Sequence, residues 1–107
     1  MELKVRVSPM ITAILEDSAD RILATCSNIG NEQYLLQRTP GFVLLSELSE
    51  IDNDVFESSD MPLLIEELKL IRETLEKAAQ AHVDDLIGLA IRCRDGNGLT
   101  LAFTPFA

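Results

Sequence analysis

The residues best suited to proton transfer lie in the second half of the chain. His82 is the single histidine, and Asp84 and Asp85 follow it closely. A hydrolase that depends on histidine needs a nucleophile within hydrogen-bond reach of the imidazole. The chain contains no G-x-S-x-G motif. We therefore expect His82 to be a surface or capping residue at the end of a helix, and we predict no catalytic residue and no enzyme.

Residues that could bind metals are present, but their spacing does not fit a metal site. Cys26 and Cys93 stand far apart without a C-x-x-C motif, so a structural zinc site is not expected. Residues 50–54 resemble the start of a calcium loop, but Val55 and Met61 occupy the positions where an EF-hand requires Gly and Glu. We predict no metal, no cofactor and two reduced thiols in the core.

The strongest chemical signal is a block of one charge sign. Residues 39–68 contain eight carboxylates and no Lys or Arg. Such a block creates a negative potential that attracts cationic surfaces and repels nucleic acid. The carboxylates are Glu47, Glu50, Asp52, Asp54, Glu57, Asp60, Glu66 and Glu67.

Length and composition limit the classes of protein that fit. A chain of 107 residues with 47% hydrophobic residues is expected to form one domain, residues 1–107, with a real core. The net charge is −9 and the nine bases are dispersed, so direct nucleic-acid binding is not expected. No signal peptide and no apolar run of about 18 residues are evident. We expect a cytoplasmic protein without a membrane partner.

The first half of the chain contains three recognisable patterns. Residues 3–7 alternate between apolar and polar, which predicts a strand. Apolar residues at three- and four-residue spacing predict a helix over residues 9–28, with a break near Asp17 as an alternative. A Pro-Gly turn between residues 33–38 and 42–48 favours a hairpin, although Leu-rich segments of this length can also be helical.

The second half begins with a polar segment, residues 49–59, which we expect to be a loop. Asp60, Met61 and Pro62 form a clear helix start, and the apolar spacing predicts a helix over residues 61–81.

The C-terminal segment admits two interpretations. Residues 86–94 fit a helix that ends in basic residues before Gly96. They also fit a strand that pairs with residues 99–103, because a three-residue turn keeps one face of that hairpin apolar. We favour the strand. Residues 99–103 form a strand in either case.

These elements predict an α+β fold of order β-α-β-β-α-β(β). We expect an antiparallel sheet of four or five strands with two helices packed on one face.

The acidic block is also the best candidate for a binding site. Phe56 lies among its carboxylates, where a large apolar residue can anchor an interface while charges around it select the partner. The alternative is that Val55 and Phe56 pack into the core beneath a solvated loop. The predicted partner-binding residues are Glu47, Glu50, Asp52, Asp54, Phe56, Glu57 and Asp60.

Two segments resemble a known group of proteins. Residues 58–68 read Ser-Ser-Asp-Met-Pro-Leu-Leu-Ile-Glu-Glu-Leu, and residues 98–103, which follow a helix and Cys93, read Gly-Leu-Thr-Leu-Ala-Phe. They are similar to the C-terminal half of small acidic bacterial immunity proteins of polymorphic toxin systems and their uncharacterised relatives. The resemblance covers about half of the chain and rests on capping and core residues. It implies a cytoplasmic protein that binds and blocks a toxin domain.

Charge and resemblance together predict a non-enzymatic acidic protein-binding module, an immunity-type inhibitor that binds and blocks a basic partner protein. One alternative is a homo-oligomeric structural or accessory protein of a bacterial operon, such as a homodimer joined through strand edges. Another is a DNA-mimicking anti-defence protein, whose carboxylates would imitate the spacing of phosphates.

Overall fold

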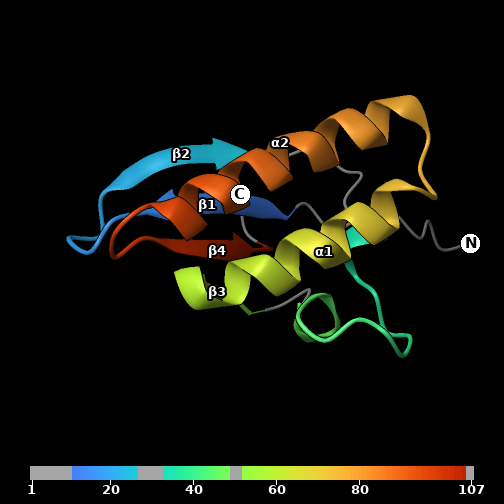
Figure 1. The fold of residues 1–107 in the computed structure, drawn as a ribbon, viewed down its shortest axis with the longest axis horizontal. Helices are drawn as coiled ribbons and strands as arrows, with labels where there is room; N and C mark the ends of the chain where they lie inside the picture. Colours follow the sequence, from blue (N-terminus) through green and yellow to red (C-terminus); the bar gives the residue numbers. More distant parts are fainter. Residues whose placement is uncertain (1–10, 27–32, 49–51, 106–107) are drawn as a thin grey trace, which may run out of the picture.

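The computed structural model describes residues 11–26, 33–48 and 52–105; the predicted strand at residues 3–7 lies outside them. The described residues form an α+β fold, which confirms the predicted fold class. A four-stranded antiparallel sheet of order β2-β1-β4-β3 is covered by two helices on one face (Figure 1). The elements are β1 (Thr12–Glu16), β2 (Ile22–Cys26), β3 (Asp54–Glu57), α1 (Met61–Arg72), α2 (Lys77–Asp95) and β4 (Thr100–Thr104).

The first two strands correct a prediction. The apolar spacing of residues 9–28 predicts a helix, but the described part of that segment is the hairpin β1-β2. The Asp17 carboxylate accepts hydrogen bonds from the N–H groups of Ala19 (2.9 Å) and Arg21 (3.0 Å), and Asp20 has a φ of 63°. Aspartates stabilise such turns through bonds to nearby backbone. The polar residues that suit a helix cap therefore reverse the chain instead.

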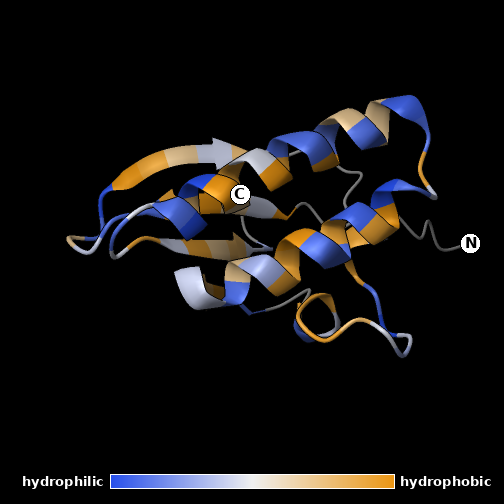
Figure 2. Ribbon diagram, in the orientation of Figure 1, coloured by the Kyte–Doolittle hydropathy of each residue, from blue (hydrophilic) through white to orange (hydrophobic). Residues whose placement is uncertain are grey.

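The core lies between the helices and the inner face of the sheet. Ala13 of β1 is the cross-strand neighbour of Phe103 in β4, and Leu15 is the neighbour of Leu101. All four side chains are at most 1% exposed. Figure 2 shows hydrophobic and hydrophilic residues in turn along both helices, and the buried ones include Leu64 and Leu68 of α1 and Leu86 and Ala90 of α2. Burial of this apolar surface is the main force that holds the two layers together.

The segment after β2 corrects a second prediction. The Pro-Gly turn forms, with Gly41 at a φ of 104°. Its flanks, residues 33–38 and 42–48, do not pair as a hairpin. They contain the short 3₁₀ helices Gln33–Leu35 and Leu45–Glu47.

Glu67 explains why residues 42–48 need no partner strand. Its side chain belongs to α1 and is only 1% exposed. The carboxylate accepts hydrogen bonds from three consecutive loop N–H groups, those of Val43 (2.7 Å), Leu44 (3.2 Å) and Leu45 (2.9 Å). A buried carboxylate is stable only when such donors surround it. These three bonds fix the loop against α1, and we call the arrangement the Glu67 clamp.

Arg38 stabilises the other end of the same loop. Its guanidinium donates hydrogen bonds to the backbone carbonyls of Ser46 (2.7 Å) and Leu48. Backbone donors and acceptors must find partners when they leave the solvent. Here the charged side chains of Glu67 and Arg38 supply the backbone hydrogen-bond partners that the other strand of a hairpin would otherwise provide.

The polar segment 49–59 is only partly a loop. Its residues from Asp54 to Glu57 form β3, which pairs with β4 at the edge of the sheet. Phe56 points into the core, where its ring meets that of Phe103 edge to face at a centroid distance of 5.9 Å. This aromatic contact anchors the edge strand to the centre of the sheet.

The predicted helix over residues 61–81 is two helices. α1 begins at the predicted residue and ends at Arg72, and α2 begins at Lys77. The Thr74 hydroxyl donates a hydrogen bond to the Ile71 carbonyl (2.8 Å). Competition of this kind for helix carbonyls favours an end to the helix.

The strand interpretation of residues 86–94 is wrong, and the helical alternative is correct. These residues lie in α2, and the N–H of Gly96 donates to the carbonyl of Arg92 (2.9 Å) at the end of the helix. The predicted strand at residues 99–103 is present as β4, which pairs with β1 and β3. The buried residues of this part of α2 are Leu86, Leu89, Ala90 and Cys93.

We predict that Glu67→Gln destabilises the fold by roughly 2 kcal/mol, because the amide replaces one acceptor oxygen with a donor that faces backbone N–H groups. The free energy of unfolding in urea measures this cost. Glu66→Gln is the matched control, since Glu66 is exposed and its change should stay within about 0.5 kcal/mol. Equal effects of the two substitutions would contradict the clamp.

Candidate protein-binding surfaces

Residues 39–48 and 52–68 gather at one side of the molecule. They form the loop with the 3₁₀ helix Leu45–Glu47, the edge strand β3 and the first part of α1. Figure 1 draws these segments in green to yellow along the lower side of the fold. The Glu67 clamp joins the loop to α1. We call the described part of residues 39–68 the acidic face.

Most of the predicted carboxylates reach the surface of the acidic face. Glu50 lies outside the described residues. The exposed carboxylates are Glu47, Asp52 and Glu57, and the half-buried ones are Asp54 and Asp60.

Phe56 is the exception among the predicted partner-binding residues. Its side chain is 4% exposed, so it belongs to the core and cannot serve as a surface anchor. The alternation of side chains along a strand gives the reason, because neighbours in β3 point to opposite faces. Val55, its neighbour, is 59% exposed.

Two of the carboxylates also stabilise the start of α1. The Asp60 carboxylate accepts a hydrogen bond from the N–H of Glu57 (3.0 Å), and the Glu57 carboxylate accepts one from the N–H of Asp60. This reciprocal pair is a capping box. Glu57 and Asp60 therefore fix the turn between β3 and α1.

Exposed apolar residues accompany the carboxylates. Leu63 and Leu70 lie four residues before and three residues after Glu67, so they flank the clamp on α1. Val43 donates its N–H to Glu67 and is itself 56% exposed. These three side chains combine apolar surface with nearby acids. The helical spacing of Leu63 and Leu70 is visible in the sequence, but the exposure of their side chains is not.

The ion pairs between described residues lie outside the acidic face. Arg72 forms the closest pair, since its Nε lies 2.6 Å from the Asp84 carboxylate and links α1 to α2. The other two pairs are Arg21–Asp17 and Arg94–Asp95. Arginine therefore neutralises acids on the hairpin and on α2, while residues 39–68 contain no base of their own.

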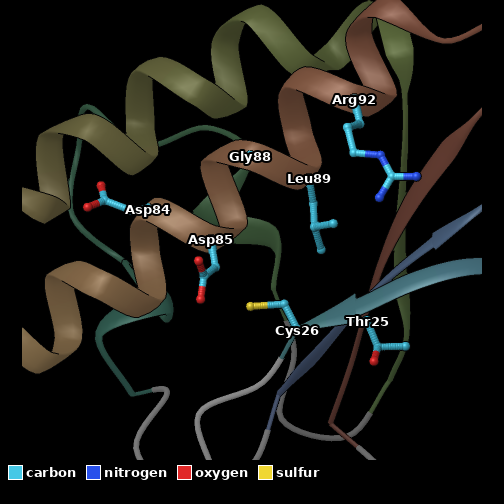
Figure 3. A pocket seen from close by; sticks show the side chains of 7 residues that line it. All are labelled: Thr25, Cys26, Asp84, Asp85, Gly88, Leu89 and Arg92. Atoms are coloured by element: carbon cyan, nitrogen blue, oxygen red, sulfur yellow. The ribbon is translucent and has the colours of Figure 1, made fainter.

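A pocket lies on the opposite side of the molecule, between β2 and α2. Its volume is about 520 Å³. Figure 3 shows Asp85 pointing toward Cys26, Leu89 pointing toward the sheet, and Arg92 at the other end. Gly88 lies between them, and a Cβ atom added there would meet nothing within 4 Å. The lining residues are Thr25, Cys26, Asp84, Asp85, Gly88, Leu89 and Arg92.

His82 is buried, which corrects the expectation of a surface or capping residue. It lies within α2 and is 6% exposed. Its Nδ1 shares a hydrogen bond with the Tyr34 hydroxyl, and the two rings meet edge to face at 5.8 Å. Its Nε2 has no hydrogen-bond partner within the described part of the chain. Burial lowers the pKa of His82, and the nearby Asp85 carboxylate opposes this only in part. The neutral imidazole thus joins α2 to the helix Gln33–Leu35.

The described residues contain no group of three or more His, Cys, Asp or Glu side chains that could hold a metal ion. Within the same part of the chain, neither α1 nor α2 is long and apolar enough to cross a membrane.

Comparisons with protein-family models, with curated proteins and with solved structures give no match to this chain.

The stability of the fold should depend on pH through His82. Because its pKa is lowered in the folded state, the unfolded chain takes up the proton more readily. The stability contributed by the neutral imidazole is present above the unfolded pKa of about 6.5 and is lost as the pH falls below it. The difference in unfolding free energy between the natural chain and His82→Gln should therefore decrease from about pH 7.5 to about pH 5.

Tyr34→Phe is the control for this experiment, because it removes the hydroxyl partner and keeps the titrating ring. Its unfolding free energy should retain the pH dependence that His82→Gln loses. A difference between the natural chain and His82→Gln that stays constant over the pH range would contradict a buried neutral imidazole.

Gly88→Ala should stabilise the protein by about 0.5–1 kcal/mol, since glycine weakens a helix interior and the added methyl group meets open space. Urea unfolding measures the change. Gly96→Ala should instead lower the stability, because its Cβ would lie 2.3 Å from Leu99 Cδ1 and 3.0 Å from the Arg92 carbonyl oxygen. A loss of stability in Gly88→Ala would show that the fold itself needs this glycine.

Proposed function

We propose that this chain is a non-enzymatic protein-binding module that uses its acidic face to bind and block a basic partner protein, as an immunity-type inhibitor does. One observation carries the proposal. Exposed apolar side chains stand among carboxylates in a segment of thirty residues without Lys or Arg. The apolar members are Val43, Val55 and Leu63, and the exposed Leu70 follows on α1 just after Lys69.

This combination matches the requirements of a selective interface. Apolar side chains near the centre of a patch supply the contact that is desolvated on binding, and polar groups around them exclude other partners. Carboxylates at the rim accelerate the encounter with a cationic surface and orient it. On α1, the apolar groups are Leu63 and Leu70, and Glu66 supplies a carboxylate. The adjacent loop adds the carboxylate of Glu47.

The charge also indicates how binding would block the partner. A protein that binds polyanions presents a basic surface to them. The acidic face would occupy that surface through its carboxylates and prevent the polyanion from approaching. Inhibition of this kind needs no catalytic residue in the inhibitor.

Neutralisation of four exposed acids tests the proposal. The basic partner is captured at low salt by the tagged full chain from its source lysate and released at high salt. Association with the purified chain is then followed by surface plasmon resonance over a salt series. A variant with Glu47→Gln, Asp52→Asn, Glu57→Gln and Glu66→Gln should associate about tenfold more slowly at low salt. Its association rate should also depend less on salt.

A matched variant controls for net charge. Asp20→Asn, Glu73→Gln, Glu76→Gln and Asp95→Asn remove the same number of charges outside the acidic face. The association rate of this variant should change less than about twofold. Equal slowing in both variants would refute a role for the acidic face, as would unchanged kinetics in the first. Circular dichroism of both variants checks that the fold is intact.

A further inference from the structure

The edge of the sheet opposite the acidic face has a different character. Among the described strands, β2 pairs only with β1. It contains no charged residue, and Ile22 and Leu23 are 60% and 43% exposed. Figure 2 shows the hydrophobic start of this strand. In contrast, the edge strand β3 carries Asp54 and Glu57. Charged residues on an edge strand discourage the addition of another strand, and β2 lacks this protection.

We propose that the groove between β2 and α2 binds an extended segment of a partner protein, which adds to β2 as a further strand. In this mode of recognition, backbone hydrogen bonds supply affinity, and alternate side chains of the added strand enter pockets that supply specificity. The groove provides both parts. The backbone of β2 supplies the strand edge, and α2 and β2 together line the pocket of about 520 Å³. This inference is independent of the acidic face.

Gly88 is the second observation that supports a binding groove. It interrupts α2 near its middle, where glycine costs about 1 kcal/mol relative to alanine. No neighbour requires this cost, because an added Cβ would contact nothing within 4 Å. The missing side chain keeps the pocket open beneath the helix. An occupant that enters the pocket would account for the glycine.

The charges of the groove define the chemistry of the occupant. Asp85 and Arg92 both line the pocket and are seven residues apart, or about 10 Å along the helix. Side chains on one face of a strand repeat every 6–7 Å or so. Two long side chains of opposite charge at alternate positions can therefore reach both residues. The occupant has a Lys or Arg that faces Asp85 and a Glu or Asp that faces Arg92.

A second copy of the chain fits the groove less well. The strand that it would add is its own β2, whose sequence Ile-Leu-Ala-Thr-Cys contains no charge for Asp85 or Arg92. Both copies would also carry a net charge of −9. Charge complementarity therefore favours a segment of a different protein.

Two blocked synthetic heptapeptides test the proposal on the full chain. The first is Thr-Val-Lys-Val-Glu-Val-Thr, and the second has Lys in place of Glu. Binding at physiological salt is measured by titration of amide chemical shifts in NMR. The first peptide should bind more tightly, and the shifts should concentrate in Ile22–Cys26 of β2 and in residues 85–92 of α2.

Three substitutions sharpen the test. Arg92→Glu should reverse the preference between the peptides, with a combined change of about tenfold or more in their ratio of dissociation constants. Arg94→Glu is the matched control, because it makes the same charge change outside the pocket and should not reverse the preference. Gly88→Leu should weaken both peptides about tenfold by filling the pocket.

Four results would overturn the proposal. One is the absence of shifts at about 1 mM of the first peptide, far above the dissociation constant of a specific site. Another is a set of shifts centred on β3 or α1. A third is an Arg94→Glu variant that behaves like Arg92→Glu. The last is self-association through β2 without peptide, since the occupant would then be a second copy.

Discussion

The Glu67 clamp is the interaction on which the acidic side of this protein depends. One buried carboxylate receives three consecutive N–H groups of the loop, so the loop packs against α1 without a partner strand. The bond from the Val43 N–H holds this part of the loop against α1, the helix that carries the exposed Leu63 and Leu70. The carboxylate is stable in the interior only because the donors converge on it. An acid of the one-sign segment thus serves the fold and positions its neighbours at the surface.

The two edges of the sheet differ in how they discourage indiscriminate strand pairing. On β3, Asp54 and Glu57 place charge at both ends of a short strand, and the capping box turns the chain at once into α1. Beside β2, Asp85 and Arg92 of α2 line the pocket instead, so an added strand would meet charges of both signs. Charge protects the first edge in general, whereas the second can admit a strand with matching charges.

The sequence predicted those elements whose signals are local. The start of α1 follows from a proline directly after Met61, and β4 follows from the alternation in residues 99–103. The segment 86–94 was predicted wrongly as a strand, because its apolar residues fit both periods and only packing against the sheet selects the helix. The bonds of Glu67 span more than twenty residues. Its position three residues after Leu64, on the apolar stripe of α1, was the only sign that it is buried.

Hydrogen–deuterium exchange of the full chain, alone and bound to its captured basic partner, tests the central claim most directly. If the partner binds at the acidic face, binding should slow exchange in residues 43–47, 54–57 and 63–70. The hairpin turn around Asp20 should exchange at the same rate in both states. Slower exchange confined to β2 and α2, with no change on the acidic face, would contradict the account.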